Sequence, residues 1–252
     1  MPPYSPDQVI LDLSFDELRY ILLWVEKREK NLVQPITVLI GGWAVYAYNP
    51  YLGSLDIDLL TNNDTKESLK YELRAKRGFQ HYRKALIENT VVKYTDYGEI
   101  KIDFGSRERL YPFEGREESL NLDICDGNTE IRNIRGDISA VIPNKSLLLL
   151  FKLKAAWDRA YRIKKGTSDD TEFERAKLIK DYADILALLD PSVERGYFDF
   201  SFLGEQFKRF HFLEDIIRVI PDSYDALSRY GRIDQQTARQ ACEKLLLLIG
   251  QP

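Results

Sequence analysis

Two aspartates separated by one residue, Asp56 and Asp58, have a spacing suited to binding a metal ion. They alternate with apolar residues, and this alternation predicts a strand over 54–60 with its apolar side chains on one face. Both carboxylates then project from the other face, where their mutual repulsion is costly unless a cation lies between them. For an isolated Asp-x-Asp, a strand whose charged face simply meets solvent is the alternative.

A third carboxylate comes from a later segment. The pattern over 91–104 predicts a hairpin, and Asp103 lies on the polar face of its second strand. If this strand pairs beside the one that carries Asp56 and Asp58, all three acids share one surface. Three carboxylates can hold two Mg²⁺ (or Mn²⁺) ions, an arrangement that supports displacement at phosphorus. Because the chain has only two histidines, oxygen ligands are favoured over a zinc site.

Gly41 and Gly42 follow a short apolar strand predicted over 37–40 and precede a helical segment over 43–48. Glycine at this place lets a phosphate approach the backbone and the N-terminus of the helix. A tight turn would account for the pair about as well. Three tyrosines in the following segment have the chemistry to stack on a nucleobase, although packing is the commoner use of such residues: Tyr46, Tyr48 and Tyr51.

The elements that position these residues fall into two halves. After Pro143 the mixed pattern gives way to helices alone. We therefore expect an α+β protein, with a small mixed β-sheet domain (1–142) followed by a helical bundle domain (143–252) and a cleft between them. The predicted helices are 16–30, with Ser14 as its N-cap, and 65–77, 146–164, 169–189, 207–219 and 236–249.

The segments Leu39-Ile-Gly-Gly-Trp43 and Leu55-Asp-Ile-Asp-Leu59 resemble the signature of the DNA polymerase β-like nucleotidyltransferases. That signature is a hydrophobic residue, Gly, Gly or Ser, and then Asp-hydrophobic-Asp. The resemblance implies metal-dependent transfer of a nucleoside monophosphate from an NTP such as ATP, with Asp103 as the third metal ligand. Many relatives carry Arg or Lys with Thr where this chain has Gly53-Ser54. This departure removes a charged phosphate contact that those relatives have.

The helical half is similar to the AbiEii-type toxin nucleotidyltransferases, through Lys152-Leu-Lys-Ala-Ala-Trp-Asp-Arg159 and Lys-Asp181-Tyr-Ala-Asp184. The resemblance implies that Lys152 and Asp181 face the cleft, with Asp184 as the competing choice. Lys152 and Arg159 are seven residues apart, so they share nearly one helix face and together could bind the phosphates of the nucleotide. Solvated helix faces, with a simple ion pair between Asp181 and Arg159, are the alternative.

The acceptor of the transferred group is left open. The AbiEii-type resemblance favours RNA, such as the 3′ end of a tRNA, and implies a toxin that a partner antitoxin protein neutralises. A protein acceptor (adenylylation) and a small molecule of the aminoglycoside kind are alternatives. A catalytically inactive protein that binds nucleotide and acts as a regulator is a further alternative, against which the presence of all three acids argues.

Composition sets wider limits. The net charge is −4, so a basic surface over the whole protein is excluded, although lysines and arginines between 152 and 180 provide a local basic face. The two cysteines are expected to be buried thiols, which suits a reducing cytoplasm. Residues 1–6 have no leader-peptide pattern, and the longest apolar run, 147–151, is too short to cross a bilayer. We therefore expect a cytoplasmic protein without membrane contact.

Overall fold

The computed structural model describes residues 7–30, 34–82 and 89–250, and it confirms the predicted α+β class. The chain divides into two compact units. The sheet unit runs to Leu110 and resumes over Asn121–Pro143, and the helical unit comprises Tyr111–Leu120 and everything from Asn144 onward. This division differs from the expected domains 1–142 and 143–252 chiefly in segment 111–120, which belongs to the helical unit. Residues 1–6, in which no leader peptide is expected, lie outside the described residues.

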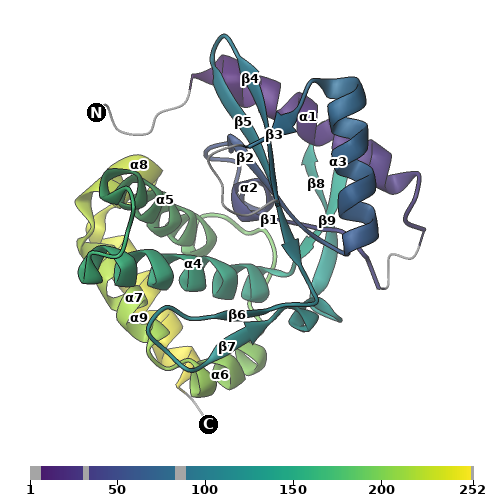
Figure 1. Cartoon of the computed structure of the whole chain (residues 1–252). Helices are drawn as coiled ribbons and strands as arrows, with labels where there is room; N and C mark the ends of the chain where they lie inside the picture. Colours follow the sequence, from purple (N-terminus) through teal and green to yellow (C-terminus); the bar gives the residue numbers. More distant parts are fainter. Residues whose placement is uncertain (1–6, 31–33, 83–88, 251–252) are drawn as a thin grey trace. The chain divides into compact units, whose positions relative to one another are not determined.

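The sheet unit is built on a mixed sheet with strand order β1-β2-β5-β4-β3 (Figure 1). β2 is antiparallel to β1 and parallel to β5, while β4 is antiparallel to both β5 and β3. A separate hairpin, which the sequence analysis did not predict, is formed by β8 and β9. The strands are β1 Val38–Ile40, β2 Asp56–Thr61, β3 Gln80–His81, β4 Thr90–Thr95, β5 Gly98–Ser106, β8 Thr129–Arg135 and β9 Ile138–Pro143.

Among its described residues, the sheet unit also contains three α-helices and a short 3-10 turn. The first helix begins well before the predicted 16–30, because the side chain of Asp7 caps it by accepting a hydrogen bond from the Val9 amide. The prediction of Ser14 as the N-cap is therefore wrong. Ser14 is buried inside the helix, where its hydroxyl donates to the Ser54 carbonyl oxygen at 2.7 Å. The helices are α1 Gln8–Glu26, α2 Gly41–Tyr48 and α3 Asn63–Arg77, and the turn is η1 Leu122–Cys125.

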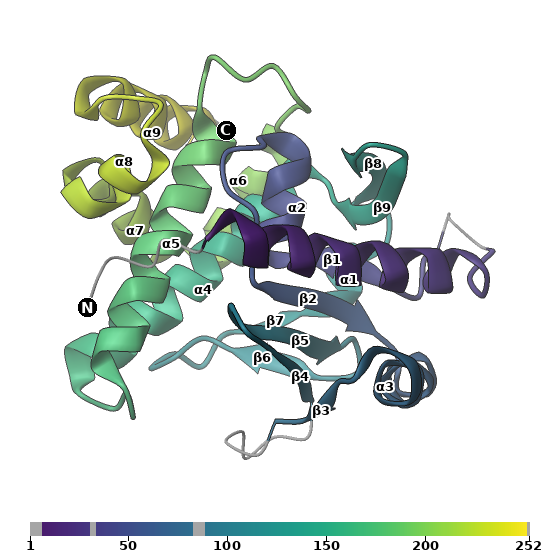
Figure 2. The same cartoon turned by 90° about the horizontal axis from the view of Figure 1, so that it is seen from above.

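One face of the five-stranded sheet is apolar, and α1 and α3 pack against it (Figure 2). Glu17 of α1, 3% exposed, joins these elements. Its carboxylate accepts hydrogen bonds from Arg77 of α3 at 2.8 Å and from Lys93 of β4 at 2.6 Å. The apolar side chains of this face are fully buried, among them Ile57, Leu59, Ile100 and Ile102. The opposite face is thereby the one that carries the aspartates.

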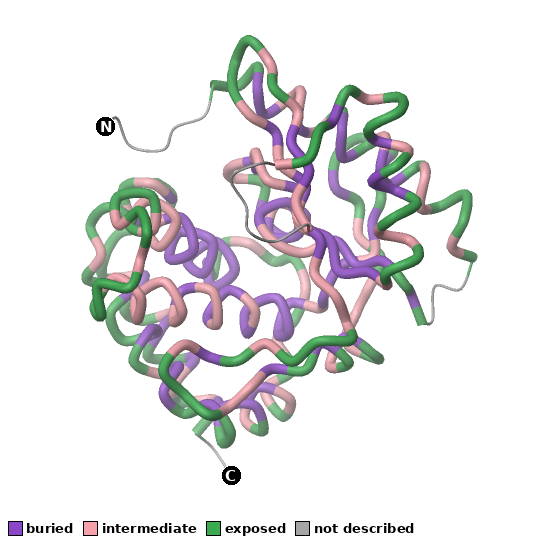
Figure 3. Tube along the Cα trace, viewed as in Figure 1, coloured by how far each residue is buried: buried purple, intermediate pink, exposed green. Residues whose placement is uncertain are grey.

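The helical unit contains six α-helices among its described residues. Buried residues concentrate in the first half of α4, up to Ala156, and in the second half of α5, from Lys180 (Figure 3). The single helix predicted over 207–219 is in fact two helices. The chain breaks at Phe210–Phe212 because both phenylalanine rings pack on Phe113, with ring centroids 4.8 and 5.1 Å away. The elements are β6 Leu110–Pro112, β7 Ser119–Asn121, α4 Lys145–Lys165, α5 Thr171–Leu189, α6 Phe200–Arg209, α7 Leu213–Val219, η2 Ile220–Asp222, α8 Tyr224–Tyr230 and α9 Gln235–Ile249.

Two expectations from composition can be compared with this fold. Cys125 and Cys242 are both buried and unpaired thiols, as predicted, and burial raises the pKa of each to about 12. Over the described ranges, none of the helices has the length and apolar character that a bilayer span requires.

We predict that Glu17→Gln lowers the free energy of unfolding by about 2 kcal/mol, because the buried side chain loses its charge-assisted hydrogen bonds to Arg77 and Lys93. Urea denaturation measures this loss. Asp12→Asn is a matched control on the same helix, since Asp12 pairs with Arg135 at a position where both side chains are 48% exposed. Equal losses for the two variants would contradict the role assigned to Glu17.

Candidate functional site

The three predicted aspartates lie on one face of the sheet. β2 and β5 pair in parallel with Asp58 opposite Asp103, which confirms the predicted pairing of these strands. Register neighbours in adjacent strands point to the same side, and so do residues two apart along one strand. Asp56, Asp58 and Asp103 therefore share a face, and each is half-buried. The sequence placed these acids correctly because the apolar alternation of both strands fixes their opposite faces.

The carboxylate of Asp58 lies against the start of α2. Gly41, the first residue of that helix, has φ +69°, and a Cβ built on it would meet Asp58 Oδ2 at 1.9 Å. Only glycine permits this approach. The N-cap residue Ile40 makes no side-chain cap hydrogen bond, and the partial positive charge of the helix N-terminus favours an anionic group there. Gly42, in the same turn, is buried. The two glycines therefore bring a helix N-terminus and a carboxylate together.

Two further side chains reach this acidic face, and the sequence analysis did not assign them to the site. Thr90 of β4 is the register partner of Asp103, and its hydroxyl donates to the Asp103 carboxylate. Lys101 of β5 is the register partner of Asp56. The alternation of β5 was the available signal for Lys101, because it places Lys101 on the same face as Asp103.

Lys101 brings positive charge to the acidic face. Its ammonium lies 3.1 Å from Glu99 and 4.8 Å from the centre of the Tyr82 ring. Partial burial acts to lower the pKa of Lys101, but the hydrogen bond to Glu99 and the charges of Tyr82, Glu99 and Asp56 outweigh it, so the net shift is upward. Lys101 is therefore held as a cation beside Asp56, where it offsets part of the repulsion among the acids.

The kind of ligand atom that the three aspartates offer indicates which metal ion they fit. Among the residues that the structure describes, no three or more His, Cys, Asp or Glu side chains are grouped so that they could hold a metal ion. The three carboxylates are thus placed on one face but not closed into a cage. Asp58 and Asp103 stand on adjacent strands, which are spaced about 4.8 Å apart. Mg²⁺ keeps several waters and takes only one or two protein carboxylates, so this donor set fits Mg²⁺ or Mn²⁺.

The predicted cationic residues of the helical unit lie in a buried ion cluster. Lys152 has a side chain that is 8% exposed, and its ammonium lies 2.6 Å from Asp184 and 3.3 Å from Asp181. Arg159 donates to the other oxygen of Asp181 at 2.9 Å. Asp181 thus contacts both Lys152 and Arg159, and its ion pair with Arg159, which the sequence offered as the alternative, is present. Which of the two aspartates faces a cleft stays a prediction, as does the cleft itself.

The cluster extends beyond these residues. Its cations are paired with carboxylates, so they do not form the freely solvated helix faces that were the alternative. Lys180 also lies against Asp184, at 2.9 Å, so that two buried ammonium groups share one carboxylate. Burial lowers the pKa of Lys180, and the charge of Lys152 lowers it further against the opposing effect of Asp184. Arg159 and Arg162 both bind Glu174 on α5. The cluster ties α4 to α5 by charge.

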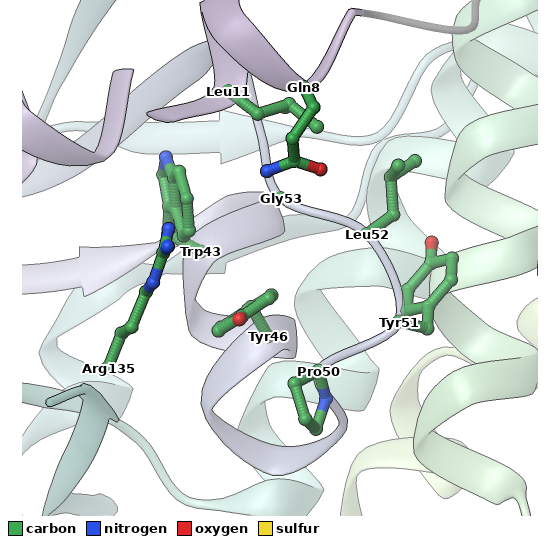
Figure 4. A pocket seen from close by; sticks show the side chains of 9 residues that line it. All are labelled: Gln8, Leu11, Trp43, Tyr46, Pro50, Tyr51, Leu52, Gly53 and Arg135. Atoms are coloured by element: carbon green, nitrogen blue, oxygen red, sulfur yellow. The ribbon is translucent and has the colours of Figure 1, made fainter. Parts of the chain in front are cut away.

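The three tyrosines considered for stacking on a base have different environments. Tyr48 is 1% exposed, and its hydroxyl lies within hydrogen-bond distance of both Glu130 and the Pro143 carbonyl oxygen, so it packs in the interior, which is the commoner use expected of these residues. Tyr46 and Tyr51 line a cavity of about 240 Å³ formed by α1, α2 and the segment before β2 (Figure 4). The guanidinium of Arg135 lies at the same cavity. Stacking on Tyr46 or Tyr51 stays a prediction.

Comparison with known proteins assigns no family to the chain. No family model matches its sequence, and no curated protein matches it.

We predict that Gly41→Ala destabilises the protein more than Gly78→Ala does. Both glycines have left-handed φ values, +69° and +74°, but a Cβ at Gly78 meets nothing within 4 Å, whereas one at Gly41 meets the Asp58 carboxylate. Gly78→Ala therefore costs only backbone strain, about 1 kcal/mol, and Gly41→Ala adds the displacement of Asp58. Urea denaturation of both variants gives the difference, and equal losses would contradict the close approach.

We also predict that Mn²⁺ binds the acidic face and that Asp56→Ala with Asp58→Ala weakens this binding by more than about 10-fold, because two oxygen ligands are lost. Calorimetry measures the affinity. The control is Asp64→Ala with Asp96→Ala, which removes the same charge from two exposed positions of the same unit. Unchanged affinity in the first double variant, or equal weakening in both, would refute the metal site.

Proposed function

We propose that the protein is a metal-dependent nucleotidyltransferase that transfers a nucleoside monophosphate from an NTP to an acceptor. The observation that carries this proposal is the placement of three aspartates on one sheet face, with Asp58 against the start of a helix at Gly41. Carboxylates and a helix N-terminus side by side offer one place for cations and one for phosphate oxygens. Transfer of a phosphoryl group depends chiefly on such positioning and charge neutralisation.

Each residue has a distinct part in the proposed reaction. Asp56, Asp58 and Asp103 would hold Mg²⁺ or Mn²⁺, which when bound neutralises the charge of the phosphates and polarises the reacting oxygens. Asp103 has the further role of accepting the proton of the acceptor hydroxyl, and the Thr90 hydroxyl orients its carboxylate. The backbone of Gly41 and Gly42 binds phosphate oxygens.

The helical unit carries the cations that the AbiEii-type resemblance assigns to nucleotide binding. Lys152 and Arg159 bind the triphosphate, and Asp181 positions both side chains, since it contacts each of them. This role differs from that of a surface lysine, because burial holds the Lys152 ammonium in one place between Asp181 and Asp184. Such fixed charges stabilise developing negative charge without reorganising during the reaction.

RNA is the acceptor that we favour, with the 3′ end of a tRNA as the specific form that the AbiEii-type resemblance implies. The same resemblance makes the protein a toxin that an antitoxin protein neutralises in the cytoplasm. These parts of the proposal depend on the motifs in 152–159 and 180–184.

Purified protein incubated with each labelled NTP, Mg²⁺ and total RNA is expected to label RNA. Asp58→Ala and Asp103→Ala should each reduce the rate on the order of 10²–10³-fold, because charge stabilisation in the transition state is lost. Asp96→Ala is the matched control, since Asp96 lies at the exposed turn of the hairpin that carries Asp103. Lys152→Met should also slow transfer, with circular dichroism showing that the helices are retained.

Parallel reactions with total protein and with aminoglycosides test the other acceptors. If protein or an aminoglycoside is labelled and RNA is not, the labelled molecule is the acceptor in place of RNA, and the proposed enzyme class still holds. Nucleotide binding without transfer to any acceptor would favour the inactive regulatory protein over the enzyme.

A further inference from the structure

The helical unit contains a cavity of about 640 Å³. Its lining includes none of the residues that the proposed function uses. It is formed by α4, α5, α7 and the turn between β6 and β7. Its walls include three aromatic rings and its rim three cations, namely Trp157, Tyr161, Tyr182, Arg116, Lys164 and Lys165. A cavity of this size, with aromatic walls and a few charged groups, is typical of sites for small organic groups.

α4 presents this cavity with a face of its own. Trp157, Ala160, Tyr161 and Lys164 line the cavity and recur at the spacing of one helix face. The ion cluster of Lys152 and Arg159 is on a different face, toward α5. One helix therefore supports two sets of functional side chains, and the cavity is not an extension of the ion cluster.

The aromatic rings are fixed in place by neighbouring groups. The Trp157 indole donates to the Glu114 carbonyl oxygen at 3.1 Å and packs against Phe212, with ring centroids 4.6 Å apart. Tyr161 covers Gly115, where a Cβ would meet its ring at 2.2 Å. Rings held in this way lose little conformational freedom when a planar ligand stacks on them.

Charge at the rim favours an anionic ligand. Lys164 and Lys165 are exposed at the C-terminal end of α4, and Arg116 lies over the rings of Trp157 and Phe212. Asp215 is the one acid among the lining residues. The adjoining hollow over the hairpin turn is lined by Glu117 and Glu118, so an anionic group is favoured on the side of the two lysines.

We infer that this cavity binds an unpaired nucleotide of a single-stranded RNA, with the base among the aromatic rings and the neighbouring phosphates on Lys164 and Lys165. Stacking on aromatic rings beside cations that follow the phosphates is how proteins bind unpaired strands. The choice of RNA rests on the proposed function, whereas the preference for an unpaired nucleotide rests on the cavity alone.

Fluorescence anisotropy with a short single-stranded RNA labelled at its 5′ end, without NTP or metal, tests this inference on the full chain. Lys164→Glu with Lys165→Glu should weaken binding by about 10-fold or more, and added salt should weaken binding to the wild type. Lys244→Glu, at an exposed position of α9, is the control and should bind nearly as the wild type does. Equal binding by the wild type and the double variant would overturn the site.

Two further measurements identify the ligand. Photo-cross-linking of RNA that contains bromouridine should attach it to the peptide with Trp157 and Tyr161, and attachment only elsewhere would overturn the site. Competition by a free nucleoside monophosphate as strong as that by RNA would overturn RNA as the ligand. RNA binding is measured without NTP, so it is tested separately from transfer. A wild-type protein that binds RNA but transfers no nucleotide contradicts only the proposed enzyme. A double variant that transfers nucleotide as fast as the wild type contradicts only this inference.

Discussion

The parallel pairing of β2 with β5 places Asp58 beside Asp103. The repulsion between these two carboxylates costs free energy, and the packing of the rest of the sheet unit offsets it. Like charges on adjacent strands repel, and the repulsion is tolerated only where other interactions fix the strands. The buried isoleucines and leucines of the opposite face do so, and α1 and α3 cover them. Glu17, Arg77 and Lys93 then connect these helices to the sheet by charge.

Several features of the fold could be predicted from the sequence because they depend on short-range patterns. Period-two alternation located β2 and β5, and glycine at Gly78 and Gly166 marked the ends of α3 and α4. The start of α1 was misplaced because serine is a common N-cap residue, whereas the Ser14 hydroxyl in fact donates to the distant Ser54 carbonyl oxygen, a contact that the local pattern does not show. The break between α6 and α7 likewise depends on the distant ring of Phe113.

In the candidate site too, contacts between residues distant in the sequence could not be predicted. The three aspartates were predictable because each lies on a strand whose faces the sequence defines. Thr90 was not, because its link to Asp103 depends on the register between β4 and β5. The hydroxyl of Tyr48 finds its partners in the unpredicted hairpin of β8 and β9. The contact of Lys152 with Asp184 required the packing of two helices, although their motifs suggested the residue types.

The segment 111–120 has a consequence for how the protein is made. It belongs to the helical unit but is enclosed in sequence by the sheet unit, so the chain passes between the units three times, near residues 110, 120 and 143. During synthesis this segment emerges before the helices that bury Phe113 exist, since Phe210 and Phe212 follow about a hundred residues later. The nascent chain must carry this hairpin with the apolar side chains of Phe113 and Leu120 uncovered through that interval. A cut at residue 143 would leave the sheet unit with the same uncovered hairpin, so the two units are not separable by one cleavage.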